Sequence, residues 1–241
     1  TRSDRDWSSD VCSSDLFNMS YMWNEFNIKT VPAETIVYRD GVFCPELSTL
    51  ANTKIDKKYK LPIHIIYVGE ITGKCRLDID VSVSNQLVIL SVRVKNNFPA
   101  FFDIFIKNTG KNSEIRGGAL LENNNDLTYN IIAEHTESNT TICVKTKLVA
   151  GKNTKSKLSG TAIIEKNTQD TVSDISFSAL ADKTARIEFM PAQRISSVPK
   201  SADHSASIYQ PTGFQIEYLR SSGLSGAEVD TTLREAFMND L

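Results

Sequence analysis

The chain has 241 residues, a formal net charge of −2 at pH 7, four cysteines and 40% hydrophobic residues. This length can bury a substantial core, and the near-neutral charge argues against a strongly basic nucleic-acid surface. The sequence has no apolar run of about 18 residues, so neither a membrane span nor a membrane partner is expected. Four cysteines without a C-x-x-C pair are too few for a disulfide scaffold, which makes a reducing cytoplasm the simplest setting.

The N-terminal segment, residues 1–18, is expected to be artefactual or disordered. Thr1 to Leu16 is rich in Ser and Asp and has no apolar periodicity. Within it, the run DWSSDVCSSDL at residues 6–16 resembles the translation of a DNA-sequencing adapter. It is therefore set aside from fold reasoning. Met19 is then a candidate start, and a natural flexible terminus or a gene cut off by the adapter are the alternatives.

The next segment, residues 19–210, reads as the β body. Apolar or alternating runs recur about every 12 to 17 residues between turn signals. The run at 34–38 leads into Asp40-Gly41, a hairpin-type turn, and Gly117-Gly118 is expected in a turn. Since no helix-period segment separates the strands and no fixed repeat is visible, a sandwich and a solenoid both remain open. The further expected strands are 61–68, 75–83, 87–95, 101–106, 126–133, 140–149, 156–164, 172–180 and 185–189.

The C-terminal segment, residues 211–241, changes to a helical period. Thr212 and Gln215 fit a capping box, as do Ser225 and Glu228. Gly223 is a natural residue to follow the first helix. Isolated helices of this length are marginal in water. Both are therefore expected to dock, either on their own body or on a partner.

Few residues in the sequence are candidates for a catalytic or ligand-binding role. His64 is expected as a strand residue, His135 at the surface, and His204 just before the helical segment. The basic stretch from Lys145 to Lys157 is more simply explained by solvated strands and a turn than by phosphate binding. The three cysteines outside the N-terminal segment are expected as small buried hydrophobic residues: Cys44, Cys75 and Cys143. Because neither zinc-ligand spacing nor a phosphate loop is present, we expect no enzyme and no bound nucleotide.

The sequence from Ala185 onward resembles the SufB/SufD family, the scaffold proteins of SUF-type iron–sulfur cluster assembly. Ala185-Arg186-Ile187-Glu188 with Pro191 resembles the family element A-E-I-D-x-x-P. His204-Ser205-Ala206-Ser207 resembles H-G-A-T, and Tyr218 to Leu224 resembles Y-L-R-S-R-G-I. Leu233, Ala236 and Phe237 resemble the closing L-x-x-A-F. Upstream, Leu158 to Ile164 resembles F-x-G-x-I, a weaker match in the same register.

The resemblance implies a mainly β, single-domain protein with a parallel β-helix body and two short C-terminal α-helices. It is closest to SufD, as a compact or divergent member. SufD-type members commonly carry Cys two residues before the histidine, where this chain has Ala202. A common Arg is replaced by Ser222.

The resemblance also implies a function and its residues. It implies a cytoplasmic scaffold subunit that pairs with SufB or a second SufD-like subunit and binds an ABC-type ATPase, SufC, through its C-terminal helices. His204 is the candidate ligand or proton handler for a transient iron–sulfur cluster shared with the partner, or else only a hydrogen-bonding interface residue. The ATPase contact is assigned to Phe214, Tyr218, Leu219, Leu233 and Phe237.

Two alternatives from other classes stay open. A β-helical carbohydrate-active enzyme needs convergent carboxylates on one strand face. Asp78 and Asp80 are the best pair available, although solvated strand carboxylates explain them more simply. A purely structural β-solenoid is the third hypothesis.

Overall fold

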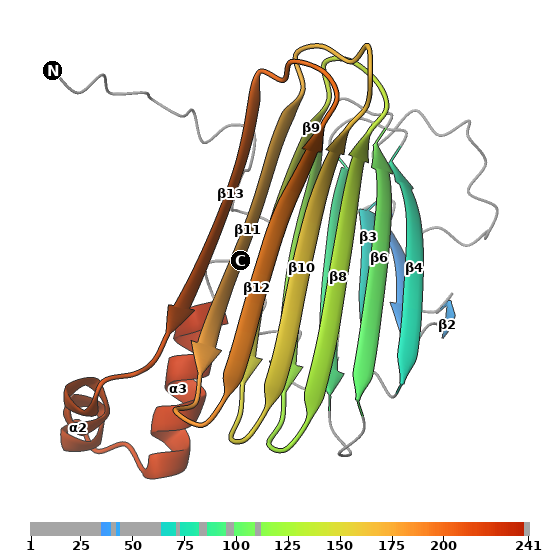
Figure 1. Ribbon diagram of the computed structural model, residues 1–241. Helices are drawn as coiled ribbons and strands as arrows, with labels where there is room; N and C mark the ends of the chain where they lie inside the picture. Colours follow the sequence, from blue (N-terminus) through green and yellow to red (C-terminus); the bar gives the residue numbers. More distant parts are fainter. Residues whose placement is uncertain are drawn as a thin grey trace, which may run out of the picture.

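Parallel strands coil into a two-sided solenoid, and two helices follow it (Figure 1). The computed structural model describes residues 35–39, 42–43, 64–70, 73–81, 86–94, 99–108 and 112–238. The strands are β1 (Thr35–Arg39), β2 (Val42–Phe43), β3 (His64–Glu70), β4 (Lys74–Val81), β5 (Gln86–Val94), β6 (Ala100–Asn108), β7 (Asn112–Leu121), β8 (Asp126–His135), β9 (Thr141–Ala150), β10 (Lys155–Ile164), β11 (Val172–Ala181), β12 (Arg186–Ile195) and β13 (Ser201–Tyr209). The helices are α2 (Gly213–Ser221) and α3 (Gly226–Met238).

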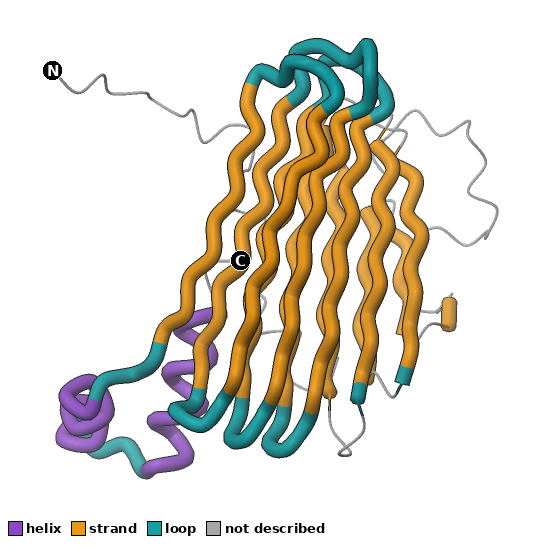
Figure 2. The backbone as a smooth tube through the Cα atoms, in the orientation of Figure 1, coloured by secondary structure: helices purple, strands orange, loops and turns teal. Residues whose placement is uncertain are grey.

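Successive strands alternate between two sheets. One sheet has the order β13-β11-β9-β7-β5-β3-β1-β2 and the other the order β12-β10-β8-β6-β4. Every pairing is parallel except the short β1–β2 hairpin. The chain thus passes from one sheet to the other and back in each solenoid turn, and Figure 2 shows the connections at both ends of the strands. This confirms the mainly β solenoid with two C-terminal helices and excludes the sandwich.

The core lies between the two sheets because strand side chains alternate between faces. On β8, every second residue from Leu127 to His135 is buried, while the residues between them are half-buried. The rows from neighbouring turns stack, so Tyr129 of β8 lies edge-on to Phe102 of β6 with ring centroids 5.5 Å apart. Burial of these stacked apolar rows is the main stabilising contribution to the solenoid.

Asparagine–threonine pairs shape three successive turns. Asn139, Asn153 and Asn167 all have positive φ, a conformation that Asn tolerates better than most residues. The Thr that follows each Asn donates its hydroxyl to the carbonyl oxygen three residues earlier, at 2.8–3.0 Å. These pairs recur every 14 residues, half a solenoid turn, and are a repeat signal that the strand pattern alone did not reveal.

Gly117 and Gly118 lie inside β7, so the turn expected there is wrong. Gly117 faces the core, where an added Cβ would lie 2.7 Å from the hydroxyl oxygen of Tyr129 and 2.9 Å from that of Thr146. The glycine leaves room for the Tyr129 side chain. Strand β7 was missed because glycine is a turn signal locally, whereas here the packing of a neighbouring aromatic residue requires it.

His135 is completely buried, so the surface position expected for it is also wrong. Its Nδ1 lies 2.7 Å from the hydroxyl oxygen of Thr140, which itself donates to the carbonyl oxygen of Glu137. The Thr140 hydroxyl proton is therefore engaged, so Nδ1 carries the imidazole proton and Nε2 carries a lone pair. Burial lowers the pKa of His135 to about 4, and the ring is neutral at pH 7.

The five lysines of the basic stretch do not form one patch. Lys145 and Lys147 lie on β9, whereas Lys155 and Lys157 lie on β10 in the other sheet. Lys152 is exposed in the turn between the two strands. Because the chain changes sheets within the stretch, a run of charge in the sequence becomes two separated pairs and a single lysine in the turn between them.

Candidate functional site

Strand β13 forms an open edge of the larger sheet. Among the described strands it pairs only with β11, so the backbone groups on its other side have no strand partner. Asp203 to Tyr209 are exposed. Natural edge strands are usually blunted by Lys, Pro or a bulge. Between Ser201 and Tyr209, β13 has neither Lys nor Pro, and it keeps a regular register with β11.

His204 lies on this edge, on the side of the sheet that faces the core. It is in register with the buried Ile175 of β11, and its own side chain is exposed. Ala202 points to the same face because it lies two residues earlier. Within the described part of the chain, no group of three or more His, Cys, Asp or Glu side chains is placed to hold a metal ion.

The opposite face of the sheet carries a pair of carboxylates, one on β13 and one on β11. Asp203 is in register with Asp174 of β11, and Ser201 donates its hydroxyl to Asp203. Burial raises the pKa of Asp174, the charge of Asp203 raises it further, and Lys145 lowers it. In the same row, the Cys143 thiol is buried, 4.0 Å from Asp174 Oδ2. The expectation that Cys143 is a small buried residue is confirmed.

The core is uncovered at the end formed by β12 and β13. On β12, the ring of Phe189 stacks on Phe177 of β11 with centroids 5.7 Å apart and is only half-buried. Ile195 of β12 and Ile208 of β13 are 44% and 52% exposed. Both are in register with buried residues of the preceding turn, Ile164 and Ala179. A further strand pair stacked here would continue both sheets and cover these side chains.

The two C-terminal helices begin as the sequence predicts. Thr212 and Gln215 form a reciprocal capping box at α2, and Ser225 and Glu228 form another at α3. Gly223 has φ 93° just after α2, a conformation that favours glycine. Neither helix is long and apolar enough to cross a membrane, among the residues that the structure describes.

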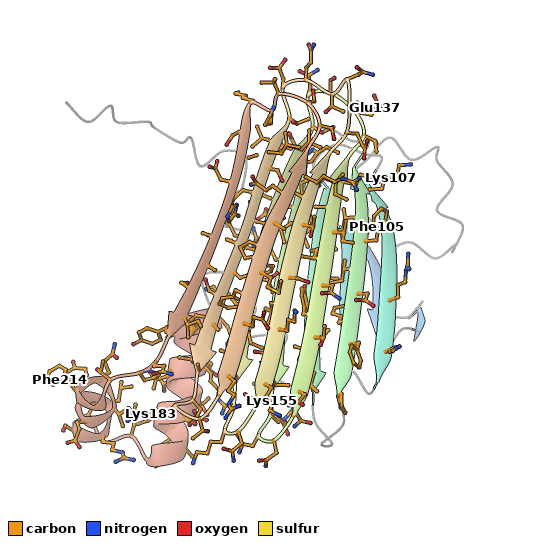
Figure 3. All side chains as sticks on the ribbon, in the orientation of Figure 1. Phe105, Lys107, Glu137, Lys155, Lys183 and Phe214 are labelled. Carbon is orange, nitrogen blue, oxygen red and sulfur yellow. The ribbon has the colours of Figure 1, made fainter. Side chains whose placement is uncertain are left out.

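The five residues assigned to an ATPase contact divide between solvent and the body. Phe214 and Tyr218 of α2 are 80% and 65% exposed, and Phe214 lies on the side of α2 away from the strands (Figure 3). Leu219 and Leu233 are half-buried, and Phe237 of α3 contacts Lys147 of β9. Helix α3 therefore docks on its own body, whereas α2 presents an unpartnered aromatic face.

Several positions singled out in the sequence lie outside the described residues or side chains. Cys44 lies outside the described residues, as does the segment 1–18, and the side chains of His64, Cys75, Asp78 and Asp80 are also outside the description. The bounds of β4 place Asp78 and Asp80 on that strand.

The feature missed from the sequence is β13 itself. Residues 201–209 consist largely of Ser and Ala and lack the β-branched and aromatic residues that indicate a strand. The spacing of the strands along the chain indicates this strand instead. Val172 pairs with Thr141, 31 residues earlier, and Ser201 pairs with Val172, 29 residues earlier. A strand at the next interval was therefore predictable from the turn length.

The described strands define a class of protein, the parallel β-solenoid, here with an uncapped end and a bare edge strand. Comparison with known families narrows this class: residues 90–237 match the model of the SufBD core domain of SUF system FeS cluster assembly. The match covers more than half of the chain, which therefore belongs to the SufB/SufD family and has a role in SUF iron–sulfur cluster assembly. No curated protein matches the chain in sequence.

Proposed function

We propose that this chain is a SufD-like, non-catalytic scaffold subunit in the cytoplasm. It pairs through β13 with a SufB- or SufD-type partner and binds a SufC-like ABC-type ATPase through its C-terminal helices. The observation that carries the proposal is the bare edge of β13 at the uncapped end of the core. A partner strand there would satisfy the backbone groups and cover the exposed apolar side chains.

His204 is the residue of this edge that could handle a nascent cluster. A neutral imidazole is a competent iron ligand, and the side chain is exposed on the pairing strand. Since Ala202 offers no thiolate, further ligands would come from the partner. The cluster is then a transient cargo of the complex, and the chain binds no nucleotide itself.

The ATPase contact is supported by the exposed aromatic pair on α2. Phe214 and Tyr218 are four residues apart, so they lie on one face of the helix. Aromatic side chains in such a position are typical anchors of protein interfaces. Leu219, Leu233 and Phe237 are closer to the body, and they would support this face more than they would contact the ATPase directly.

The test is co-expression with a SufB-type partner and a SufC-type ATPase, followed by affinity purification and iron and sulfide analysis. We expect the double change Phe214→Asp, Tyr218→Asp to remove the ATPase and leave the partner bound. The matched control is Val198→Asp, an apolar residue that is 85% exposed away from the helices. Wild-type protein that captures neither component would overturn the scaffold assignment.

The cluster role of His204 is tested in the same complex. We expect His204→Ala to leave assembly intact and to lower the iron and sulfide content, whereas Ser205→Ala, on the opposite face, leaves both unchanged. Unchanged iron and sulfide in the His204→Ala complex would contradict the ligand role and reduce His204 to an interface residue.

A further inference from the structure

A cavity of about 530 Å³ lies between the helical segment and the body. It lies where α2, α3 and the connection at Gln210 and Pro211 meet the carboxyl ends of β9 and β11. Its volume is within the range of pockets that hold small molecules.

Apolar side chains from both sides line the cavity. Val149 and Leu180 are neighbours in register on β9 and β11, and they point away from the solenoid core. Ile216 of α2, together with Val229 and Leu233 of α3, lines the helical side. Transfer of the apolar part of a small ligand from water to these aliphatic groups is favourable.

The charges around the cavity are mostly positive. Four cationic side chains line it, against the two carboxylates of Asp182 and Asp230. Both carboxylates have partners: Asp182 accepts bonds from the backbone N–H and hydroxyl of Thr184 at 2.9 and 2.7 Å, and Asp230 pairs with Arg234 at 2.7 Å. The cationic side chains are Lys152, Lys183, Arg220 and Arg234.

Of the two arginines that line the cavity, Arg220 is the one available to a ligand, because Arg234 is paired with Asp230. No carboxylate of the described residues forms an ion pair with it. Arg220 belongs to α2, and its guanidinium lies at the start of α3, where its Nη2 would be 3.8 Å from a Cβ added to Gly226. A guanidinium beside an aliphatic cavity is suited to an anionic group joined to an apolar body.

We propose that this cavity binds a small organic anion, with its apolar body against Val149, Leu180 and Leu233 and its anionic group at Arg220. The charge balance of the lining selects an anion over a neutral or cationic molecule. This site is separate from the exposed face of Phe214 and Tyr218, so its test does not depend on the proposed ATPase contact.

The experiment titrates the full chain with two fluorescent probes of the same body. One is 8-anilinonaphthalene-1-sulfonate, and the other is N-phenyl-1-naphthylamine, which lacks the sulfonate. We expect saturable binding with one site, and tighter binding of the sulfonate probe. Arg220→Glu should weaken the sulfonate probe by about tenfold and leave the neutral probe nearly unchanged, because only the ionic contact is reversed.

A second variant tests the apolar part of the site. Leu180→Trp fills the cavity and should weaken both probes, with circular dichroism as the check of folding. The matched controls are Lys107→Glu on β6, which changes an exposed charge far from the cavity, and Phe214→Ala, which removes an exposed apolar side chain. Equal sulfonate affinity in wild type and Arg220→Glu, or loss of binding in Phe214→Ala, would overturn the proposal.

Discussion

The Lys147 ammonium group holds the last turn of α3 against the solenoid. Its Nζ donates to the carbonyl oxygen of Phe237 at 2.5 Å and lies 5.1 Å from the centroid of the Phe237 ring. The two residues are 90 positions apart in the sequence. A carbonyl near a helix C-terminus lacks an intrahelical donor, so a lysine from the body satisfies it and attaches the helix at the same time.

Replacing this lysine should loosen α3 without unfolding the solenoid. We expect Lys147→Met to cost about 1–3 kcal/mol of docking free energy, from a charge-assisted hydrogen bond and a cation–π contact. Hydrogen exchange of the α3 amides would become faster, while exchange in β8 and β10 stays unchanged. The control is Lys157→Met, a lysine on the other sheet. Equal α3 protection in Lys147→Met and wild type would show that this contact does not hold the helix.

Gly117 should not tolerate even one methyl group. We expect Gly117→Ala to lower the free energy of unfolding in urea by about 1–3 kcal/mol, because its Cβ would overlap the Tyr129 and Thr146 hydroxyl groups. The added change Tyr129→Phe should restore part of the loss. Gly213→Ala is the matched control, since an added Cβ there meets nothing within 4 Å. Similar losses at both glycines would contradict the packing account.

Buried His135 should make the protein sensitive to mild acid. Its folded-state pKa of about 4 lies below the ordinary 6.5, so the unfolded chain binds the proton more tightly. This contribution to stability is present above pH 6.5 and is lost as the pH falls toward 4, by about 3 kcal/mol at most.

Urea unfolding of wild type and His135→Asn between pH 7 and pH 4 measures this effect. We expect a steeper loss of stability in wild type, because the asparagine does not titrate. His204→Ala, which removes an exposed histidine, is the control and should follow wild type. Parallel curves for wild type and His135→Asn would rule out His135 as the source of acid sensitivity.

A charge on the bare edge should block pairing while preserving the fold. We expect Ala206→Lys to prevent association with a SufB- or SufD-type partner, because a lysine on an edge strand opposes strand addition. Light scattering after size-exclusion chromatography would report the subunit alone. Thr128→Lys, on the outer face of β8, is the control and should still pair. Normal association of the Ala206→Lys protein would place the interface elsewhere.

Much of the local structure was predictable because its signals are local. Alternating residues in β8, the hairpin of β1 and β2, and both capping boxes act over a few residues, and all of them form as expected. The resemblance that begins at Ala185 indicated the family, to which the chain does belong. The candidate interface was only partly predictable, since His204 was singled out while the strand that carries it was not.

The remaining features depend on which strands become neighbours. His135 ends a strand and reads as a surface residue, yet stacked solenoid turns bury it completely. Gly117 reads as a turn, yet it lies inside β7, where the tyrosine from the opposite sheet leaves no room for a larger residue.

The sequence by itself therefore determined most of the strands, the caps, the β class and the family of this protein. Only the tertiary structure decided that β13 is a bare edge, that Lys147 holds Phe237, and that a cavity remains beneath the helices. The physical reason is the distance along the chain over which each interaction acts. Hydrogen bonds and side-chain alternation within a segment are recorded in neighbouring residues, whereas pairing between strands about 30 residues apart is set by packing in three dimensions.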